Sequence, residues 1–139
     1  MICYIDSSVV LRNILGSDGA YNDFSQFKKV GSSEILSIEC NRVLDRYRLE
    51  KILSDEQISK AKFELNQTIE GLYFIEISEK IKQRAASAFP TIIGTLDAIH
   101  LSSAILWRET EKTEKMFIAT HDKQMTACAI ALNFTIIGN

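Results

Sequence analysis

The chain has 139 residues, of which 46% are hydrophobic and 24% charged, with one proline and six glycines. A chain of this length fits one domain that buries about two thirds of its unfolded surface, and the composition excludes a disordered or collagen-like protein. The formal net charge of −2 excludes a protein that its overall charge draws onto nucleic acid or an anionic membrane, so any RNA contact requires a local basic patch.

The three cysteines, Cys3, Cys40 and Cys128, show neither the spacing of a zinc site nor the density of a disulfide scaffold. We expect them to be buried thiols in a reducing compartment. The N-terminal segment MICYIDSSVV has no basic lead and reaches an aspartate too early for a signal peptide. No stretch of about 18 apolar residues follows, so we expect a cytoplasmic protein that does not enter a membrane.

The first predicted elements are a strand and a helix. The apolar run ICYI at residues 2–5 ends at Asp6, and apolar residues then recur at helical spacing over 9–15. A second strand is predicted over EILS at 34–37, with Ser37 as the N-cap of the next helix. The predicted apolar face of that helix consists of Ile38, Val43, Leu44, Tyr47 and Leu49.

The middle of the chain continues the alternation of helix and strand. Ser54 and Gln57 form a capping-box pattern at the start of an amphipathic helix that is predicted to end at Gly71. The run LYFIEI then predicts a strand. Ser78 is predicted to cap a helix that reaches about Ala88, before the break at Phe89-Pro90.

The last part of the chain completes an α/β pattern. Thr95 is predicted to cap the helix LDAIHLSSAILWRE, and MFIAT, KQMTACAIAL and FTII then predict a strand, a helix and a last strand. Because strands and helices alternate with short connections, the predicted fold class is α/β, with three α/β/α layers and a mainly parallel central sheet. In such sheets, binding sites gather outside the carboxyl ends of the strands.

Four acidic residues stand where this rule makes them informative. Asp6 ends the first strand and Glu39 falls in the first turn of the next helix. Asp97 opens the helix before the segment MFIAT, and Asp122 follows that segment. Carboxylates crowded at one edge of a sheet repel one another and normally hold a cation, and oxygen ligands favour Mg²⁺ or Mn²⁺. Each acid alone has a structural explanation as a helix cap or a charge at a helix N-terminus. The prediction of a metal site therefore rests on the four together.

Four segments of the chain together resemble the PIN-domain family, especially the VapC-type toxins of bacterial and archaeal toxin–antitoxin pairs. They are YIDSSVVL, LSIECNRVL, TLDAIHLSSA and FIATHDKQMTACA, and their order covers nearly the whole chain. The resemblance implies a single PIN-like domain over residues 1–139. It also implies that Asp6, Asp97 and Asp122 surround a metal ion, with Glu39 completing the acidic cluster directly or through water.

The same resemblance implies an activity, a cofactor and partners. The activity is magnesium-dependent hydrolysis of RNA phosphodiester bonds by an endoribonuclease, with Mn²⁺ as a possible substitute for Mg²⁺. The partners are an RNA substrate, a cognate antitoxin and a second copy of the chain in a homodimer. Ser8, and Thr120 in the T-x-D segment, match the hydroxyl positions that orient the carboxylates.

Basic and aromatic residues suggest where RNA and an antitoxin would bind. Arg42 and Arg46 are four residues apart on the helix that carries Glu39, so they share a face and are predicted to contact RNA phosphates. The alternative is an ordinary solvated face, on which these arginines pair with Asp45. The residues predicted to belong either to an antitoxin groove or to the core are Phe24, Phe27 and Tyr47.

Other classes of protein fit the pattern less well. A receiver-type phosphoacceptor domain needs paired acids after the first strand, where this chain has Asp6-Ser7, and a lysine after a late strand, which FTIIGN lacks. A catalytically silent PIN-fold binding module stays open as an alternative, although the presence of all four acids argues against it. His100 and His121 lack the spacing of a zinc site, and we expect His100 to pack or hydrogen-bond on its helix.

Overall fold

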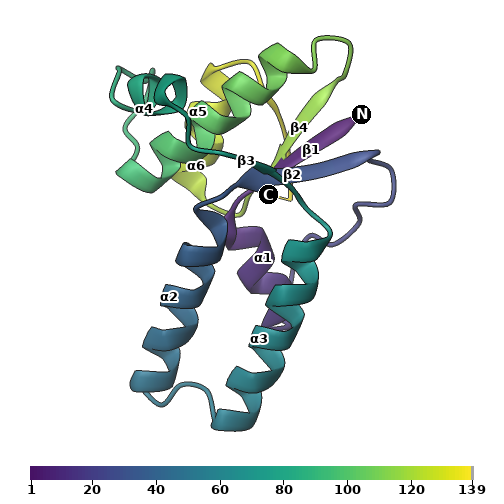
Figure 1. Ribbon diagram of the computed structural model, residues 1–139, viewed down its shortest axis with the longest axis vertical. Coiled ribbons are helices and arrows are strands. Elements are labelled where there is room, and N and C mark those ends of the chain that lie inside the picture. Colours follow the sequence, from purple (N-terminus) through teal and green to yellow (C-terminus); the bar gives the residue numbers. More distant parts are fainter. Residues whose placement is uncertain (139) are drawn as a thin grey trace.

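The computed structural model of the chain describes residues 1–138, in which strands alternate with helices (Figure 1). Within this range the strands are β1 (Ile2–Ile5), β2 (Lys29–Ser33), β3 (Tyr73–Ile75), β4 (Met116–Ala119) and β5 (Thr135–Ile137). The helices of the same range are α1 (Ser7–Ile14), α2 (Leu36–Leu49), α3 (Asp55–Glu70), α4 (Glu79–Ala85), α5 (Thr95–Thr110) and α6 (Lys123–Ala131). None of these helices has the length and apolar character that crossing a membrane requires.

The strands form one sheet in the order β3-β2-β1-β4-β5, and every neighbouring pair is parallel. Helices α1, α2 and α3 cover one face, and α5 and α6 cover the other, with α4 packed against α5 (Figure 1). Parallel strands need crossover connections, and their helices cover both faces of the sheet. The predicted three-layer α/β fold class is confirmed.

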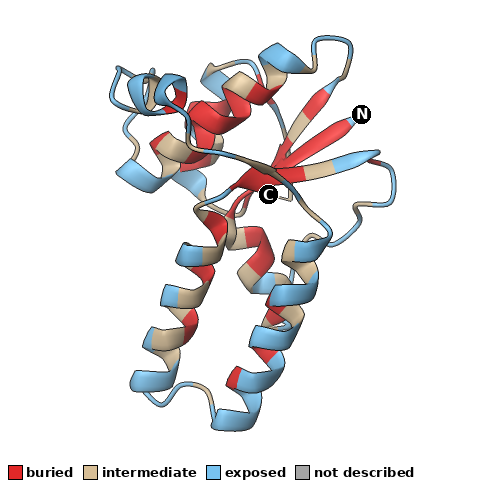
Figure 2. Cartoon of the chain, in the orientation of Figure 1, coloured by how far each residue is buried: buried red, intermediate tan, exposed pale blue. Residues whose placement is uncertain are grey.

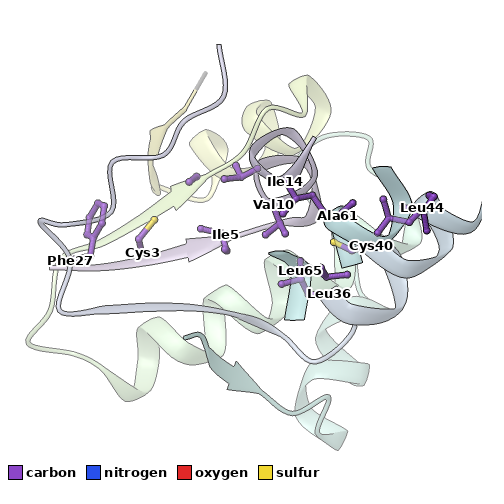
Figure 3. Packing of buried hydrophobic residues seen from close by; sticks show 13 residues of the cluster. Cys3, Ile5, Val10, Ile14, Phe27, Leu36, Cys40, Leu44, Ala61 and Leu65 are labelled. Carbon is purple, nitrogen blue, oxygen red and sulfur yellow. The ribbon is translucent and has the colours of Figure 1, made fainter. Parts of the chain in front are cut away.

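The central strand β1 has a separate core on each of its faces. Cys3 and Ile5 pack with residues of α1, α2 and α3, whereas Ile2 and Tyr4 pack with residues of α5 and α6. All four side chains are buried, and β1 is drawn in red along its length in Figure 2. Figure 3 shows the first core, in which Ile5 lies among side chains from the three helices. The buried free thiols are, as predicted, Cys3, Cys40 and Cys128.

The prediction of a second strand over residues 34–37 is wrong. The second strand is β2, with the sequence KVGSS, and the chain then enters α2 with Ile35 as N-cap. Glycine and lysine are weak strand formers, so β2 is a strand because it pairs with β1 and β3 in the buried sheet. The Ser32 hydroxyl donates to a main-chain carbonyl of β1 at 2.7 Å. Ser37 lies inside α2 and does not cap it.

The buried face of α2 also differs from the predicted one. Leu36, Cys40 and Leu44, spaced four residues apart, are buried, whereas Ile38 and Leu49 are each 64% exposed. Residues three or four positions apart share a helix face, and the predicted set had mixed the inner face with the outer one. Two apolar side chains of α2 therefore lie on its solvent side.

Apart from Ser37, the helix starts follow the predicted capping patterns with one exception. Ser54 and Gln57 form the predicted capping box at the start of α3. The Ser78 hydroxyl accepts a hydrogen bond at the start of α4, although α4 is shorter than predicted. Thr95 is the first residue of α5 and not its cap, because Gly94 occupies the N-cap position.

The strand order creates a switch point at the centre of the sheet. The chain runs outward from β1 through β2 to β3 and then continues on the other side of β1 with β4 and β5. The carboxyl ends of β1 and β4 are adjacent, with Ile5 paired to Ala119, which is where open α/β sheets bind ligands. Receiver domains have the strand order 2-1-3-4-5. The receiver alternative is therefore wrong.

Gly31 of β2 provides a test of the packing between the sheet and α5. A Cβ atom at this position would lie 2.8 Å from Cη2 of Trp107 and 2.9 Å from the carbonyl oxygen of Tyr73. The Trp107 ring stacks on the Tyr73 ring, so neither group can withdraw freely. We expect Gly31→Ala to lower the free energy of unfolding by about 1–3 kcal/mol in urea denaturation.

Gly71→Ala is the matched control for this substitution. A Cβ atom at Gly71 meets the carbonyl oxygen of Thr68 at 3.6 Å, an ordinary contact, and the residue has helical backbone angles. Its free energy of unfolding should be unchanged or raised by up to about 1 kcal/mol. Equal stabilities of the two variants would contradict the tight packing around Gly31.

Candidate active site

Asp6 lies at the carboxyl end of β1 and is the N-cap of α1. Its Oδ1 accepts hydrogen bonds from the Ser8 hydroxyl at 2.5 Å and from the backbone N–H groups of Ser8 and Val9 at 3.1 and 3.3 Å. Its Oδ2 accepts a hydrogen bond from the Thr120 hydroxyl at 2.6 Å. Burial raises the pKa of Asp6, and the Ser8 and Thr120 hydroxyls oppose that rise. The two hydroxyls predicted to orient the carboxylates thus both contact Asp6.

The loop after β4 is bound to the same network. The backbone N–H of His121 donates to the Ser8 hydroxyl at 2.9 Å, and that of Asp122 donates to the Thr120 hydroxyl at 3.0 Å. Asp122 is the N-cap of α6, where its Oδ1 accepts a backbone N–H of the helix at 2.8 Å. The T-x-D segment therefore fixes both Thr120 and Asp122 relative to the end of β1.

Glu39 reaches the site from the first turn of α2, and both of its carboxylate oxygens are hydrogen-bonded. Its Oε2 accepts from the Ser7 hydroxyl at 3.3 Å, and its Oε1 lies 2.5 Å from Nε2 of His100. Nδ1 of His100 lies 2.7 Å from the Tyr4 hydroxyl. The prediction that His100 hydrogen-bonds on its helix is confirmed, with Glu39 and Tyr4 as its partners.

Asp97 has a raised pKa that reflects its burial and the neighbouring acids. It lies in the first turn of α5, and its pKa is raised to about 6. Burial is the largest cause, followed by the negative charges of Asp122 and Asp6, and the charge of Glu39 adds to them. Charges affect a pKa in this way only when they lie near the group. The structure therefore brings the four predicted acids into one electrostatic neighbourhood.

The donor atoms of this cluster are carboxylate oxygens, which Mg²⁺ and Mn²⁺ prefer. Among residues 1–138, no three His, Cys, Asp or Glu side chains converge closely enough to enclose a metal ion. The arrangement is an open cluster and not a closed cage. Magnesium typically binds through one or two protein carboxylates and keeps several waters, so this donor set fits it.

The two arginines predicted to contact RNA lie on the exposed side of α2. Arg42 and Arg46, together with Glu39, line a cavity of about 650 Å³ beside the acidic cluster. Arg42 also pairs with Asp45 at 3.2 Å, and Asp45 pairs with Arg48 at 3.0 Å. Arg42 is therefore paired on a solvated face, as in the alternative description, and the contact of Arg42 and Arg46 with RNA stays a prediction.

The three aromatic residues considered for an antitoxin groove occupy different environments. Phe27 is buried in the core, and Tyr47 is half-buried on α2. Phe24 is half-buried and lines a cavity of about 320 Å³, together with residues of α1, α3 and β2. Only Phe24 of the three borders an apolar opening in the part of the chain that the structure describes.

Tyr4 and Ser7 are site residues that the sequence analysis missed. Both contact the cluster through hydrogen bonds, Tyr4 by way of His100 and Ser7 directly to Glu39. The signal that could have identified them is their position in YIDSS, on either side of Asp6. His121, in contrast, accepts a backbone N–H of the segment before β2 at 3.3 Å, and its ring has no assigned part in the cluster.

Comparison with known proteins finds a match in fold. A chain in the crystal structure of VapBC2 from Rickettsia felis, bound to a DNA fragment from their promoter, superposes with a TM-score of 0.67. The two chains are 16% identical, and the match covers 99% of this chain and 98% of that chain. No family model matches the sequence, and no curated protein matches it. The resemblance to VapC-type PIN-domain proteins is thus confirmed at the level of the fold.

The raised pKa of Asp97 predicts how stability depends on pH. Because the folded-state pKa of about 6 exceeds the ordinary value of 3.8, the folded protein favours the protonated carboxyl. Asp97 therefore costs stability above its folded pKa, and this cost disappears as the pH falls through about 6 toward 3.8. Asp97→Asn should raise the melting temperature at about pH 8 and have a smaller effect at about pH 5.

Thermal unfolding in the presence of a chelator measures this difference without any contribution from bound cations. The burial-raised pKa of Asp6 is present in both proteins, so the difference from wild type reports Asp97 together with its coupling to the neighbouring carboxylates. A difference in melting temperature that is the same at both pH values would contradict the proposed origin of the shift.

Proposed function

We propose that the chain is a magnesium-dependent endoribonuclease that hydrolyses RNA phosphodiester bonds and acts as the toxin of a toxin–antitoxin pair. The observation that carries the proposal is the placement of Asp6 and Asp122 at the adjacent carboxyl ends of β1 and β4, where the Thr120 hydroxyl donates to Asp6 and accepts the backbone N–H of Asp122. Perturbed carboxylates gathered at the switch point of a parallel sheet are typical of a functional site. The PIN-like fold, shared with a chain of a VapBC2 structure, supports the same class of activity.

The acidic cluster suits hydrolysis with the help of Mg²⁺. A bound Mg²⁺ would polarise the phosphodiester and lower the pKa of a water molecule toward neutrality. Asp6, Asp97 and Asp122 are the residues proposed to hold it, one or two of them directly and the rest through its bound waters, with Mn²⁺ as a substitute. Asp6 is oriented by two hydroxyls, which leaves Oδ2, with its single hydrogen bond, as the oxygen available to a further partner.

Glu39 has a different role in this proposal. Each of its oxygens already accepts one hydrogen bond, from Ser7 or from His100. Its side chain is 9% exposed, so little of it can reach solvent. We assign Glu39 a contact with a water molecule of the site and not with the metal ion. A carboxylate held in this way can accept a proton from the attacking water or orient its oxygen.

Arg42 and Arg46 are proposed to hold RNA phosphates beside this cluster. They line the same cavity of about 650 Å³ as Glu39, so a phosphate bound by them would lie near the carboxylates. The positive side chains also offset the negative cluster, which would otherwise repel the RNA backbone. The chain as a whole has a formal charge of −2, so such a local patch is required.

A cognate antitoxin is the proposed protein partner. The cavity bordered by Phe24 is lined by apolar residues of α1 and β2, and a second cavity of about 300 Å³ lies between α1 and α3. The first cavity is mainly apolar and suits the apolar face of an amphipathic helix, and the second also has polar and charged side chains, among them Gln57, Lys60 and Glu64. Homodimerisation, which the family resemblance implies, stays a prediction, and light scattering of the purified chain decides it.

RNA cleavage by the purified chain is the central test of the proposed activity. We expect cleavage with Mg²⁺ or Mn²⁺ and none in a chelator. Asp6→Asn and Asp97→Asn should each reduce kcat by more than the about 10- to 100-fold that loss of an outer partner costs, because each removes a charge from the proposed metal site.

Glu79→Gln is the matched control, since it neutralises an exposed carboxylate in the first turn of α4, whose ion-pair partner is Lys82 on the same helix. Circular dichroism of every variant confirms that it is folded. Full cleavage by a folded Asp6→Asn or Asp97→Asn variant would exclude this site, and the absence of cleavage by wild type with either cation would leave the catalytically silent binding module.

The arginine pair is tested by the salt dependence of RNA binding. Each phosphate contact contributes about 0.7 to the slope of log affinity against log salt for a single strand. Replacing both Arg42 and Arg46 with alanine should reduce the slope by about 1.4 and raise KM. Arg48→Ala is the control, because it removes one arginine from the same helix at a position outside the cavity, and it should leave the slope unchanged. Equal slopes for wild type and both variants would refute the assignment.

A further inference from the structure

A buried chain of hydrogen bonds joins three elements next to the acidic cluster. It runs from the Tyr4 hydroxyl of β1 to Nδ1 of His100 on α5 at 2.7 Å, and from Nε2 of His100 to Oε1 of Glu39 on α2 at 2.5 Å. Tyr4 is fully buried and His100 is 1% exposed. The aromatic rings of Tyr4 and His100 also meet edge to face, with centroids 5.8 Å apart. His100 is thus held from one side and contacts Glu39 on the other.

The contacts around Tyr4 give this chain a direction. The backbone N–H of Ser33 donates to the Tyr4 hydroxyl oxygen at 3.1 Å. The nearby hydroxyls of Ser32 and Ser103 donate their own protons to main-chain carbonyls at 2.7 and 2.8 Å. The Tyr4 hydroxyl is assigned as the donor in its 2.7 Å contact with Nδ1 of His100, because a neutral imidazole nitrogen is a stronger acceptor than the hydroxyl oxygens of Ser32 and Ser103. A neutral imidazole that accepts at Nδ1 carries its proton on Nε2.

In this tautomer the Nε2–H group of His100 donates a hydrogen bond to Oε1 of Glu39 at 2.5 Å. We propose that His100 is a positioning residue for Glu39, and that Tyr4 selects the His100 tautomer that donates to Glu39. This inference rests on the proposed function, because it concerns how one carboxylate of the proposed nuclease site is held. Ser7 donates to the other oxygen of Glu39, so the carboxylate plane is fixed from two directions.

The chemistry of the position supports positioning over simple core packing. His100 lies on α5 among Leu101, Ala104 and Ile105, which are buried apolar residues of the same core. An apolar side chain would fill this place without the cost of burying a polar ring. The polar ring supplies the hydrogen bond to Oε1 of Glu39. Without this donor, the Glu39 side chain would be free to rotate about its bonds. Outer partners of this type typically change metal affinity or activity by about 10- to 100-fold when they are removed.

The first experiment observes the chain directly, without RNA or a metal ion. Long-range ¹H–¹⁵N correlation of the histidine rings distinguishes the two tautomers, and His121→Asn assigns the spectrum because the sequence has two histidines. We expect His100 protonated at Nε2 alone in wild type, and a mixture of tautomers in Tyr4→Phe. A His100 ring protonated at Nδ1 in wild type, or one unaffected by Tyr4→Phe, would overturn the inference.

The second experiment compares three replacements of His100 that keep different contacts. A glutamine amide reaches about as far as Nε2 and keeps the donor to Glu39, an asparagine amide reaches only the position of Nδ1 near Tyr4, and leucine keeps neither. The carboxylate ¹³C shift of Glu39 should stay near that of wild type in His100→Gln and move in His100→Asn and His100→Leu. Mn²⁺ affinity and RNA cleavage should fall by about 10- to 100-fold in the last two and much less in His100→Gln.

Thermal unfolding of the three variants separates positioning from a loss of stability. Cleavage could fall in proportion to the drop in melting temperature, with His100→Gln as impaired as His100→Leu. That result would show that His100 only supports the core, and it would overturn the inference. If wild type neither cleaves RNA nor binds Mn²⁺, the proposed function fails, and the histidine and carboxylate spectra still decide whether Tyr4 and His100 hold Glu39.

Discussion

The buried carboxylate of Asp6 is the group on which the arrangement of the site depends. A carboxylate at 3% exposure is costly unless donors surround it, and four hydrogen bonds reach this one. Three come from Ser8 and Val9 at the start of α1, and the fourth comes from Thr120 after β4. The donor set is complete only when β1 and β4 are adjacent, so the strand order and the burial of Asp6 depend on each other.

The same geometry brings carboxylates close enough to repel one another. Asp122 follows Thr120 by two residues, and Asp97 lies in the first turn of α5, where the charges of Asp122 and Asp6 act on it. Partial burial raises the pKa of Asp97 to about 6, and the repulsion from the neighbouring carboxylates adds to that rise. A fold selected for stability alone would separate these carboxylates. A cation bound between these carboxylates would offset their repulsion and could bind a phosphate at the same place, which explains why they lie close together.

Strand β1 organises both sides of this site through the alternation of its side chains. Tyr4 points to the layer of α5, where it meets His100, and Ile5 points to the layer of α1, α2 and α3. The strand then ends at Asp6, between the two layers. Glu39 from one layer and His100 from the other meet next to this strand end. The acidic cluster is therefore supported from both faces of the sheet and not from one loop.

The sequence by itself determined the order of the elements and the identity of the acids. Apolar period, caps and breakers are local signals, and they located β1, β3, β4, β5 and the helices, with errors at Ser37 and Thr95. They failed at β2, because KVGSS has little strand propensity and becomes a strand only through pairing with β1 and β3. The acids were recognisable because each follows or precedes a predicted strand.

Only the tertiary structure decided which side chains support those acids. The contact of Glu39 with His100 joins residues 61 positions apart, and that of Asp6 with Thr120 joins residues 114 positions apart. Pairing between Tyr4 and His100 depends on the strand order and on the face to which α5 packs. These relations arise from packing between layers, and no local pattern in the chain encodes the distance between two atoms that meet only after the layers assemble.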